Sequence, residues 1–399
     1  MLPPERMCIR SPEEPSMRPK NSVLFAVLLL VAGFALLDRH PVRAGEVTPN
    51  SGYKVLDPIR HGNLTVFPVA AAKSYPTGEF LTLDEGLHSG EVVVTEAGSV
   101  QGLIRRHGTP IHRDDGAEVN RLVLVNNSRR PLLLLAGEVV SGGKQDRVIA
   151  KDRIVPAESD PIDLSVFCVE HGRWVVTSER FGASQAMYGS AMGAPVSKAP
   201  APMAIMVQPS VRAKAMGDKN QQEVWDEVSK QTSAMKVQVA NGAPSAARDM
   251  ATVSSYARVN ENQEVQKYIE SVARPIEQSY QSLIHQLRDR NAVGVVVAVN
   301  GRIVWADVFA STDLLSKYWP KLVRSYASEA VVTRSKEMEL TTKQADAFLA
   351  DIQGRKEMIE SEPGIYRHTE VTGDGFKAFE LTSLLPKTGF DVHLAKMAE

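Results

Sequence analysis

A run of polar residues follows the most apolar strand that the sequence predicts. Residues 132–136 are apolar on both faces of a strand, and Glu138 lies just beyond them. After a glycine pair come Lys144, Gln145, Asp146 and Arg147. Lys144 and Arg147 are suited to binding an anion, with Glu138 or Asp146 acting as a base or orienting the ligand.

This motif has a structural alternative. Its spacing is neither that of a P-loop nor GxGxxG, so no nucleotide-binding signature supports it. A tight turn in which Glu138 pairs with Arg147 or Arg173 would use the same residue types without any ligand.

A second polar motif contains Glu170, His171 and Arg173. The apolar segments 164–169 and 174–177 flank it and predict a hairpin with Glu170 opposite Arg173. Loops gather where strands end, so we expect the two motifs to meet in space. The predicted ligand-binding residues are Glu138, Lys144, Gln145, Asp146, Arg147, Glu170 and Arg173.

Catalytic and metal signatures are weak. Cys168 could act as a nucleophile with His171 as base, but a packed core cysteine is the alternative that we favour. The histidines show neither HExxH nor another close ligand spacing, so no metal site is predicted, and the sequence identifies no cofactor.

Residues 293–309 predict a hairpin that turns on Asn300-Gly301, the type I′ signature. The expected register places Val297 opposite Val304. Both faces are largely apolar, so the hairpin should lie inside a sheet.

Asp307 shares its expected face of this hairpin with Ile303, Trp305 and Phe309. A carboxylate in that company should lie at a sheet border or accept hydrogen bonds from backbone N–H groups. A catalytic role is the less favoured alternative.

The element order indicates an α+β fold, with mixed or antiparallel sheets built from hairpins and packed with several helices. A capping box at Thr82 and Glu85 predicts a short helix, Pro275 predicts a kink or split in its helix, and Pro320 predicts a second break. Helices are expected at 221–235, 261–289, 312–326 and 341–352, and a last hairpin at 365–382.

The chain divides into segments of different composition. These are a signal peptide (1–44, with an upstream-start extension, 1–16), a strand-rich part (45–182), an Ala-, Met- and Pro-rich insert (183–219) and a helix-rich part (220–399). The insert lacks a periodic apolar face, which predicts a surface loop.

The first segment predicts export to the periplasm or the extracellular space. Basic residues 17–20 precede an apolar run at 23–37, and Val42 and Ala44 suit cleavage after Ala44. The run is shorter than the ~20 residues that span a bilayer, so no stable membrane span is expected after cleavage.

Composition excludes other classes. The 399 residues contain 46 Lys plus Arg and 47 Asp plus Glu, a net charge of −1, which does not suggest a nucleic-acid partner. Two cysteines exclude a disulfide-stapled scaffold.

The two polar motifs, read as GE…GGKQDR and CVEHGRW, resemble the bacterial ARG- and rhodanese-phosphatase-superfamily-associated protein domain family. Val224-Trp225 and the segment AVGVVVAVNGRIVWADVFAS fit the same family, over residues 52–385. The family name implies genomic association with ADP-ribosylglycohydrolases and phosphatases, and the resemblance transfers no catalytic residues.

Three functions remain open on the sequence. The chain could be an exported ligand-binding or accessory domain for an unknown small molecule. It could be a hydrolase of a phosphate- or ADP-ribose-like compound, or an envelope protein that contacts a partner through the insert. Whether it is an enzyme is left open.

Overall fold

The structure, a computed structural model, describes residues 52–97, 119–183, 205–287, 291–333 and 339–399. They belong to one compact unit, Val47–Glu399, which is distinct from the unit Met1–Glu46. The predicted signal peptide and residues 184–204 of the predicted insert lie outside the described residues. Within the described ranges, no helix has the length and apolar character needed to cross a membrane.

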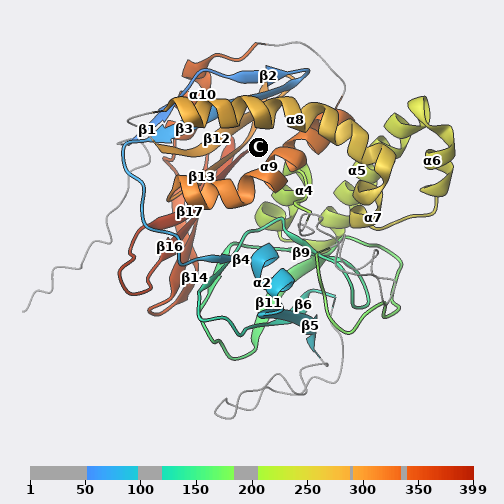
Figure 1. Ribbon diagram of the computed structural model, residues 1–399, viewed down its shortest axis with the longest axis horizontal. Helices are drawn as coiled ribbons and strands as arrows, with labels where there is room; N and C mark the ends of the chain where they lie inside the picture. The colour runs from blue at the N-terminus through green and yellow to red at the C-terminus, as the bar shows by residue number, and fades with distance from the viewer. Residues whose placement is uncertain (1–51, 98–118, 184–204, 288–290, 334–338) are drawn as a thin grey trace, which may run out of the picture. The chain divides into compact units, whose positions relative to one another are not determined.

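The largest sheet is built from segments far apart in the sequence (Figure 1). Its strands are β1 (Tyr53–Val55), β2 (Ile59–His61), β3 (Leu64–Ala71), β12 (Asn291–Val299), β13 (Arg302–Phe309), β14 (Arg355–Glu362), β15 (Tyr366–Gly373), β16 (Phe376–Ser383) and β17 (Asp391–Ala398). The order is β1-β3-β12-β13-β17-β16-β15-β14, with β2 paired to β3, and all these pairs are antiparallel.

Helices cover both faces of this sheet, so its central strands are apolar on both sides. Val295 and Val297 of β12 pack in one core with α8 (Gln263–Gln286) and α9 (Thr312–Val332). The alternate residues Val296 and Ala298 pack with α10 (Thr342–Ala350) in another. The internal hairpin predicted at 293–309 is confirmed as β12 and β13.

The hairpin register differs from the prediction by a β-bulge. Val299 pairs with Arg302, but Val297 pairs with Trp305, so Val304 is an extra residue. Ile303 therefore packs on the α10 side of the sheet, whereas Trp305 packs on the α9 side. The expectation that Ile303 and Trp305 share a face is wrong.

Two smaller sheets form a β-rich part. The first contains β4 (Leu81–Thr82), β7 (Leu132–Leu134) and β10 (Arg153–Val155), with β7 at its centre as the doubly apolar run predicts. The second has the order β5-β6-β11-β9-β8, formed by β5 (Val92–Glu96), β6 (Arg121–Asn126), β8 (Val139–Val140), β9 (Arg147–Ile149) and β11 (Ile162–Cys168). Only β4 and β7 are parallel among the described pairs, and the predicted α+β class is confirmed.

Thr82 caps α2 (Leu83–Ser89) through the predicted capping box with Glu85. Helices α5 (Gln221–Gly242), α6 (Pro244–Asp249) and α7 (Tyr256–Glu261) precede α8. Helices α8 and α9 run without interruption through Pro275 and Pro320, so the predicted split at Pro275 and the predicted break at Pro320 are wrong. Burial of the long apolar face of each helix stabilises it by more than the loss of one hydrogen bond at its proline costs.

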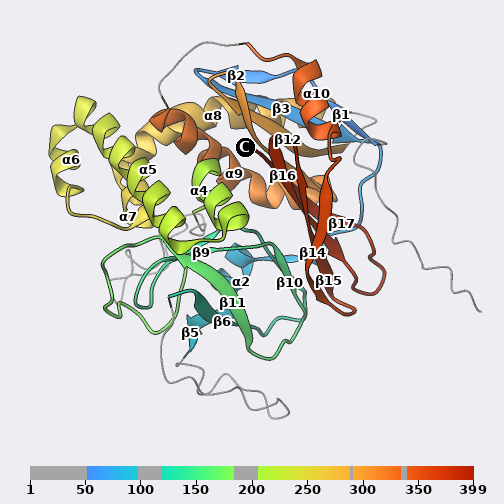
Figure 2. The ribbon, with the colours of Figure 1, turned by 180° about the vertical axis from the view of Figure 1, so that it is seen from behind.

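The loop predicted over 183–219 is wrong for its last residues. Pro209–Ala213 form α4, and Lys214–Asp218 continue it as a π-helical turn, η2. Met206 and Met216 are buried in the core, and α4 lies against α5 and α9 (Figure 2). Isolated helices this short are marginal, so burial against neighbours accounts for them, and composition could not predict it.

Candidate functional site

Six of the predicted residues come together around Arg173. Its guanidinium lies 2.6 Å from Glu170 and 3.6 Å from Asp146, and it donates to the carbonyl oxygen of Gly143 at 3.1 Å. Asp146 also accepts a hydrogen bond from the Ser255 hydroxyl at 2.6 Å. Burial and the neighbouring Glu170 raise the pKa of Asp146, while Ser255 and Arg173 limit the rise.

The other members join this group through the backbone or an aromatic ring. Gln145 Nε2 donates to the Glu170 carbonyl oxygen at 3.1 Å. Lys144 places its Nζ 4.8 Å from the ring centre of Trp174. Arg147 is fully buried, and its guanidinium makes one long hydrogen bond of 3.5 Å, from Nη1 to the Asp146 carbonyl oxygen.

The glycine pair explains why the turn is so tight. Gly142 and Gly143 have φ values of +133° and +50°. A Cβ on Gly143 would approach the Phe181 ring to 2.3 Å, and one on Gly142 would approach Ser178 Oγ to 2.5 Å. The turn therefore packs directly under residues 178–181, and Arg173 ties its carbonyl groups in place.

The hairpin predicted around Glu170 is absent. Strand β11 ends at Cys168 and pairs with β6 on one side and β9 on the other. Next to the predicted turn, β9 occupies one edge of residues 166–168, and on the other edge the Gln221 side chain bonds the N–H and carbonyl groups of Cys168. Residues 174–177 therefore have no edge to join, and Trp174, Val175 and Val176 are exposed.

Cys168 is a core residue. It is fully buried, its thiol donates to the Glu170 carbonyl oxygen at 3.3 Å, and burial raises its pKa. His171 packs edge-on against Trp225 with ring centres 4.6 Å apart. These contacts favour the packed cysteine over the nucleophile.

Glu138 belongs to a different group. Its carboxylate lies 2.5 Å from the Lys321 ammonium and accepts from the Leu135 N–H at 2.8 Å. Lys321 also pairs with Asp84 at 2.5 Å, so one buried cation serves two acids. Glu138 thus pairs with Lys321 rather than with Arg147 or Arg173.

Asp307 lies at the centre of a buried charged group that the sequence reasoning did not assemble. Both its oxygens lie 2.9 Å from Arg212 Nη1, and Tyr326 also donates to it. His393 bridges Asp307 and Asp152, with ring nitrogens 3.1 Å and 2.6 Å from the two carboxylates. All five side chains are essentially buried, so the expectation of a sheet-border or backbone-bonded Asp307 is wrong.

Electrostatics favour the charged forms of Asp307 and His393. Burial alone would raise the pKa of Asp307, but Arg212 and His393 hold it below its usual range. Burial opposes a charged His393, but Asp152 raises its pKa. In the sequence, this charged group is marked only by an acid in strand β13 and a histidine in strand β17. The group could not be assembled from local patterns because its members come from distant segments.

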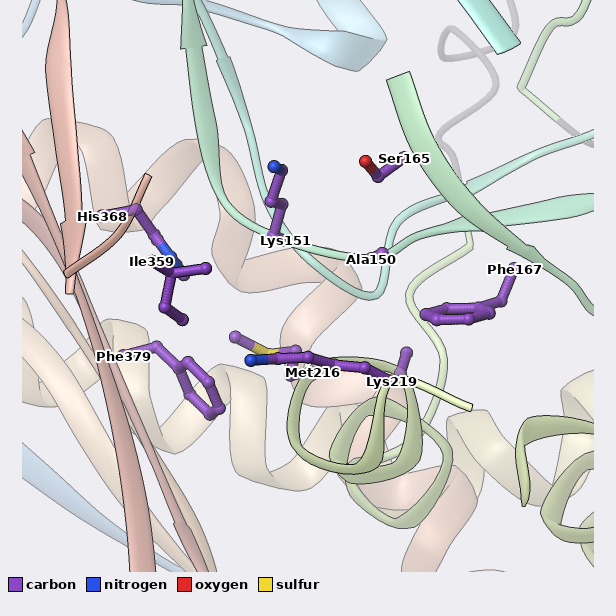
Figure 3. Close-up of a pocket in the computed structure, with 10 residues that line it drawn as sticks. Ala150, Lys151, Ser165, Phe167, Met216, Lys219, Ile359, His368 and Phe379 are labelled. Atoms are coloured by element: carbon purple, nitrogen blue, oxygen red, sulfur yellow. The ribbon is translucent and has the colours of Figure 1, made fainter. Parts of the chain in front are cut away.

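A pocket of about 230 Å³ lies beside this group, between the large sheet and the β-rich part (Figure 3). It is lined by Ala150, Lys151, Ser165, Phe167, Ala215, Met216, Lys219, Ile359, His368 and Phe379. In Figure 3, His368, Ile359 and Phe379 lie on one side, Ser165 and Phe167 lie on the other, and Met216 and Lys219 form a third wall.

His368 is the pocket residue with an unmet hydrogen-bonding capacity. It is 1% exposed, and neither ring nitrogen has a hydrogen-bond partner. Burial lowers its pKa to about 4; Lys151 and Lys219 add to this effect, whereas Asp152 opposes it. The imidazole is therefore neutral near pH 7 and offers one donor and one acceptor.

Among the described residues, no group of three or more His, Cys, Asp or Glu side chains is arranged to hold a metal ion. The fold and pocket together define an α+β domain with a small, mostly apolar cavity. The chain belongs to the ARG and Rhodanese-Phosphatase-superfamily-associated Protein domain family, whose model matches residues 52–397, and the predicted family is confirmed. No curated protein and no solved structure is detectably similar to the chain.

Proposed function

We propose that this chain is an exported small-molecule-binding domain and that its ligand occupies the His368 pocket. The observation that carries the proposal is the buried imidazole on the pocket wall, with both nitrogens unpartnered. Buried polar groups are nearly always hydrogen-bonded, and a ligand would supply the missing partner.

The size of the pocket favours this function over hydrolysis of an ADP-ribose-like compound. A cavity of about 150 Å³ accommodates one benzene ring. The pocket here has about 230 Å³, which suits one substituted ring, whereas an ADP-ribose-like compound would have to extend beyond it.

The chemistry of the lining also favours binding over catalysis. No carboxylate is among the described residues that line the pocket. Ser165, the one hydroxyl residue of that lining, lies across the pocket from His368, so the two do not form a nucleophile and base pair (Figure 3).

For the Arg173 group we propose a structural role. Arg173 already uses its donors on Glu170 and on the carbonyl groups of the glycine turn. A structural role was the alternative that the sequence offered, but the acids that pair with Arg173 are Glu170 and Asp146 rather than Glu138.

Ligand binding is tested by thermal shift with a panel of single-ring compounds and ADP-ribose, on the wild type and on His368→Leu. We expect some ring compounds to raise the wild-type midpoint and to lose this effect in the variant. Stabilisation by ADP-ribose that His368→Leu leaves unchanged would favour the hydrolase alternative.

Export rests on the basic segment, the apolar run and the cleavage tripeptide before residue 45. Mass spectrometry of the protein from its native host should give a chain that begins at Gly45. A chain that retains residues 23–37 would contradict cleavage.

A further inference from the structure

We propose that the His368 pocket binds a singly charged organic carboxylate built on one ring, and that Lys151 and Lys219 select for the negative charge. This inference rests on the proposed ligand-binding function and names the class of ligand.

The first support is the charge of the lining. Two lysines and a histidine line the pocket, and no acidic side chain among the described residues does so. The acids that pair with the lysines lie outside the lining, on β14 and β15, the last two strands at one edge of the large sheet. Lys219 pairs with Glu370 of β15 at 2.7 Å, and Lys151 pairs with Glu360 of β14.

The second support is the state of His368. Burial is the largest cause of its lowered pKa and Lys151 and Lys219 add to it, so together they outweigh Asp152 and Glu370, which favour the protonated ring. A cationic ligand would be disfavoured by the same burial and by the same two lysines. A ligand carboxylate would instead accept a hydrogen bond from the His368 N–H and be attracted by the ammonium groups of both lysines.

The third support limits the ligand to one negative charge and one ring. Glu360 and Glu370 already neutralise much of the lysine charge, so the remaining attraction suits a monoanion better than a phosphate dianion. Phe167, Met216, Ile359 and Phe379 supply apolar walls for a ring, in a volume that has room for little more.

The test uses three probes of nearly equal size: benzoate, benzamide and benzylamine. Their affinities for the full chain at pH 7 are measured by ligand-observed NMR, because fragments of this size bind weakly. We expect benzoate to bind about tenfold tighter than benzamide, the size of one charge-assisted hydrogen bond, and benzylamine to bind more weakly than both. Phenyl phosphate, added as a fourth probe with a dianionic group, should bind no more tightly than benzoate.

The lysines are tested by Lys151→Met and Lys219→Met, with Lys230→Met as control. Lys230 is 71% exposed on α5 and lines none of this pocket, so its variant should behave as wild type. Each pocket variant should lose most of the preference for benzoate while it keeps its affinity for benzamide. Far-UV circular dichroism checks that the variants fold.

The outcomes separate the two proposals. Binding of benzylamine as tight as that of benzoate, or an unchanged preference in both lysine variants, overturns the carboxylate assignment and leaves the binding function standing. Tighter binding of phenyl phosphate overturns the limit to one charge. If none of the four probes binds, and no compound of the thermal-shift panel acts through His368, the ligand-binding function itself fails.

Discussion

Arg212 and Asp307 form an ion pair at the centre of the molecule, with Arg212 Nη1 2.9 Å from each carboxylate oxygen. Arg212 lies on α4 and Asp307 on the central strand β13, so the pair joins a short helix to the large sheet. The Arg212 guanidinium also lies 4.6 Å from the ring centre of Trp305. The short helix is thereby fixed by both charge and packing.

Removal of the charge from Asp307 should destabilise the fold strongly. Asp307→Asn leaves Arg212 buried without its anion, and breaking such a pair costs about 3–5 kcal/mol. Urea denaturation measures the loss. Asp346→Asn, at an exposed aspartate of α10, is the matched control and should change stability by less than about 0.5 kcal/mol. A loss below about 1 kcal/mol in Asp307→Asn would show that the buried charges are not interdependent.

Arg173 should contribute far more to stability than its neighbour Lys144. Arg173→Ala leaves the buried Asp146 and Glu170 without their cation, so we expect a loss of about 3–5 kcal/mol. Lys144→Ala removes an ammonium–ring contact to the half-exposed Trp174, which is worth less than about 1 kcal/mol. Urea denaturation of Arg173→Ala and Lys144→Ala measures the two losses of stability. Similar losses of stability in the two variants would contradict the structural role proposed for Arg173.

Sequence patterns predicted best those features that depend on neighbouring residues. The capping box at Thr82 and Glu85 and the turn at Asn300-Gly301 depend on a few adjacent residues, and both are present. The central position of β7 followed from an apolar run, because only an interior strand buries both faces.

The features that could not be predicted depend on distant partners. The predicted hairpin after Glu170 is absent because β9 and the Gln221 side chain occupy the two edges at the end of β11, and a local pattern carries no information on edge occupancy. The helical form of α4 depends on a core supplied by other segments. The contacts of His393 with Asp152 depend on residues 241 positions apart.

The turn of the central hairpin should tolerate no β-branched residue at Gly301. Asn300 and Gly301 have φ values of +51° and +68°, as a type I′ turn requires. Gly301→Val forces a left-handed conformation on a β-branched residue, at a cost of roughly 1–2 kcal/mol. Gly78→Val is the matched control, because its φ is not left-handed and its Cβ would meet no atom within 4 Å. Equal stability of the two variants would contradict the turn assignment.

His368 should make the fold less stable in acid. In the unfolded chain a histidine takes up its proton near pH 6.5, whereas burial holds the pKa of His368 in the folded protein to about 4. Between these values the unfolded state binds more protons, so the free energy of unfolding falls as the pH is lowered. The contribution of this one residue reaches about 3 kcal/mol below pH 4.

The measurement compares wild type with His368→Leu by urea denaturation at several pH values between 7 and 4. The stability of the variant relative to wild type should rise by about 3 kcal/mol across this range, because leucine cannot take up the proton in either state. His393, whose pKa is raised, titrates in both proteins and cancels in the difference. His285→Leu, at an exposed position of α8, controls for the loss of a surface histidine. A constant difference between wild type and His368→Leu would mean that His368 has the same pKa in the folded and unfolded chain, as a solvated histidine has. His368 would then not be the buried, unpartnered imidazole on which the proposed function depends.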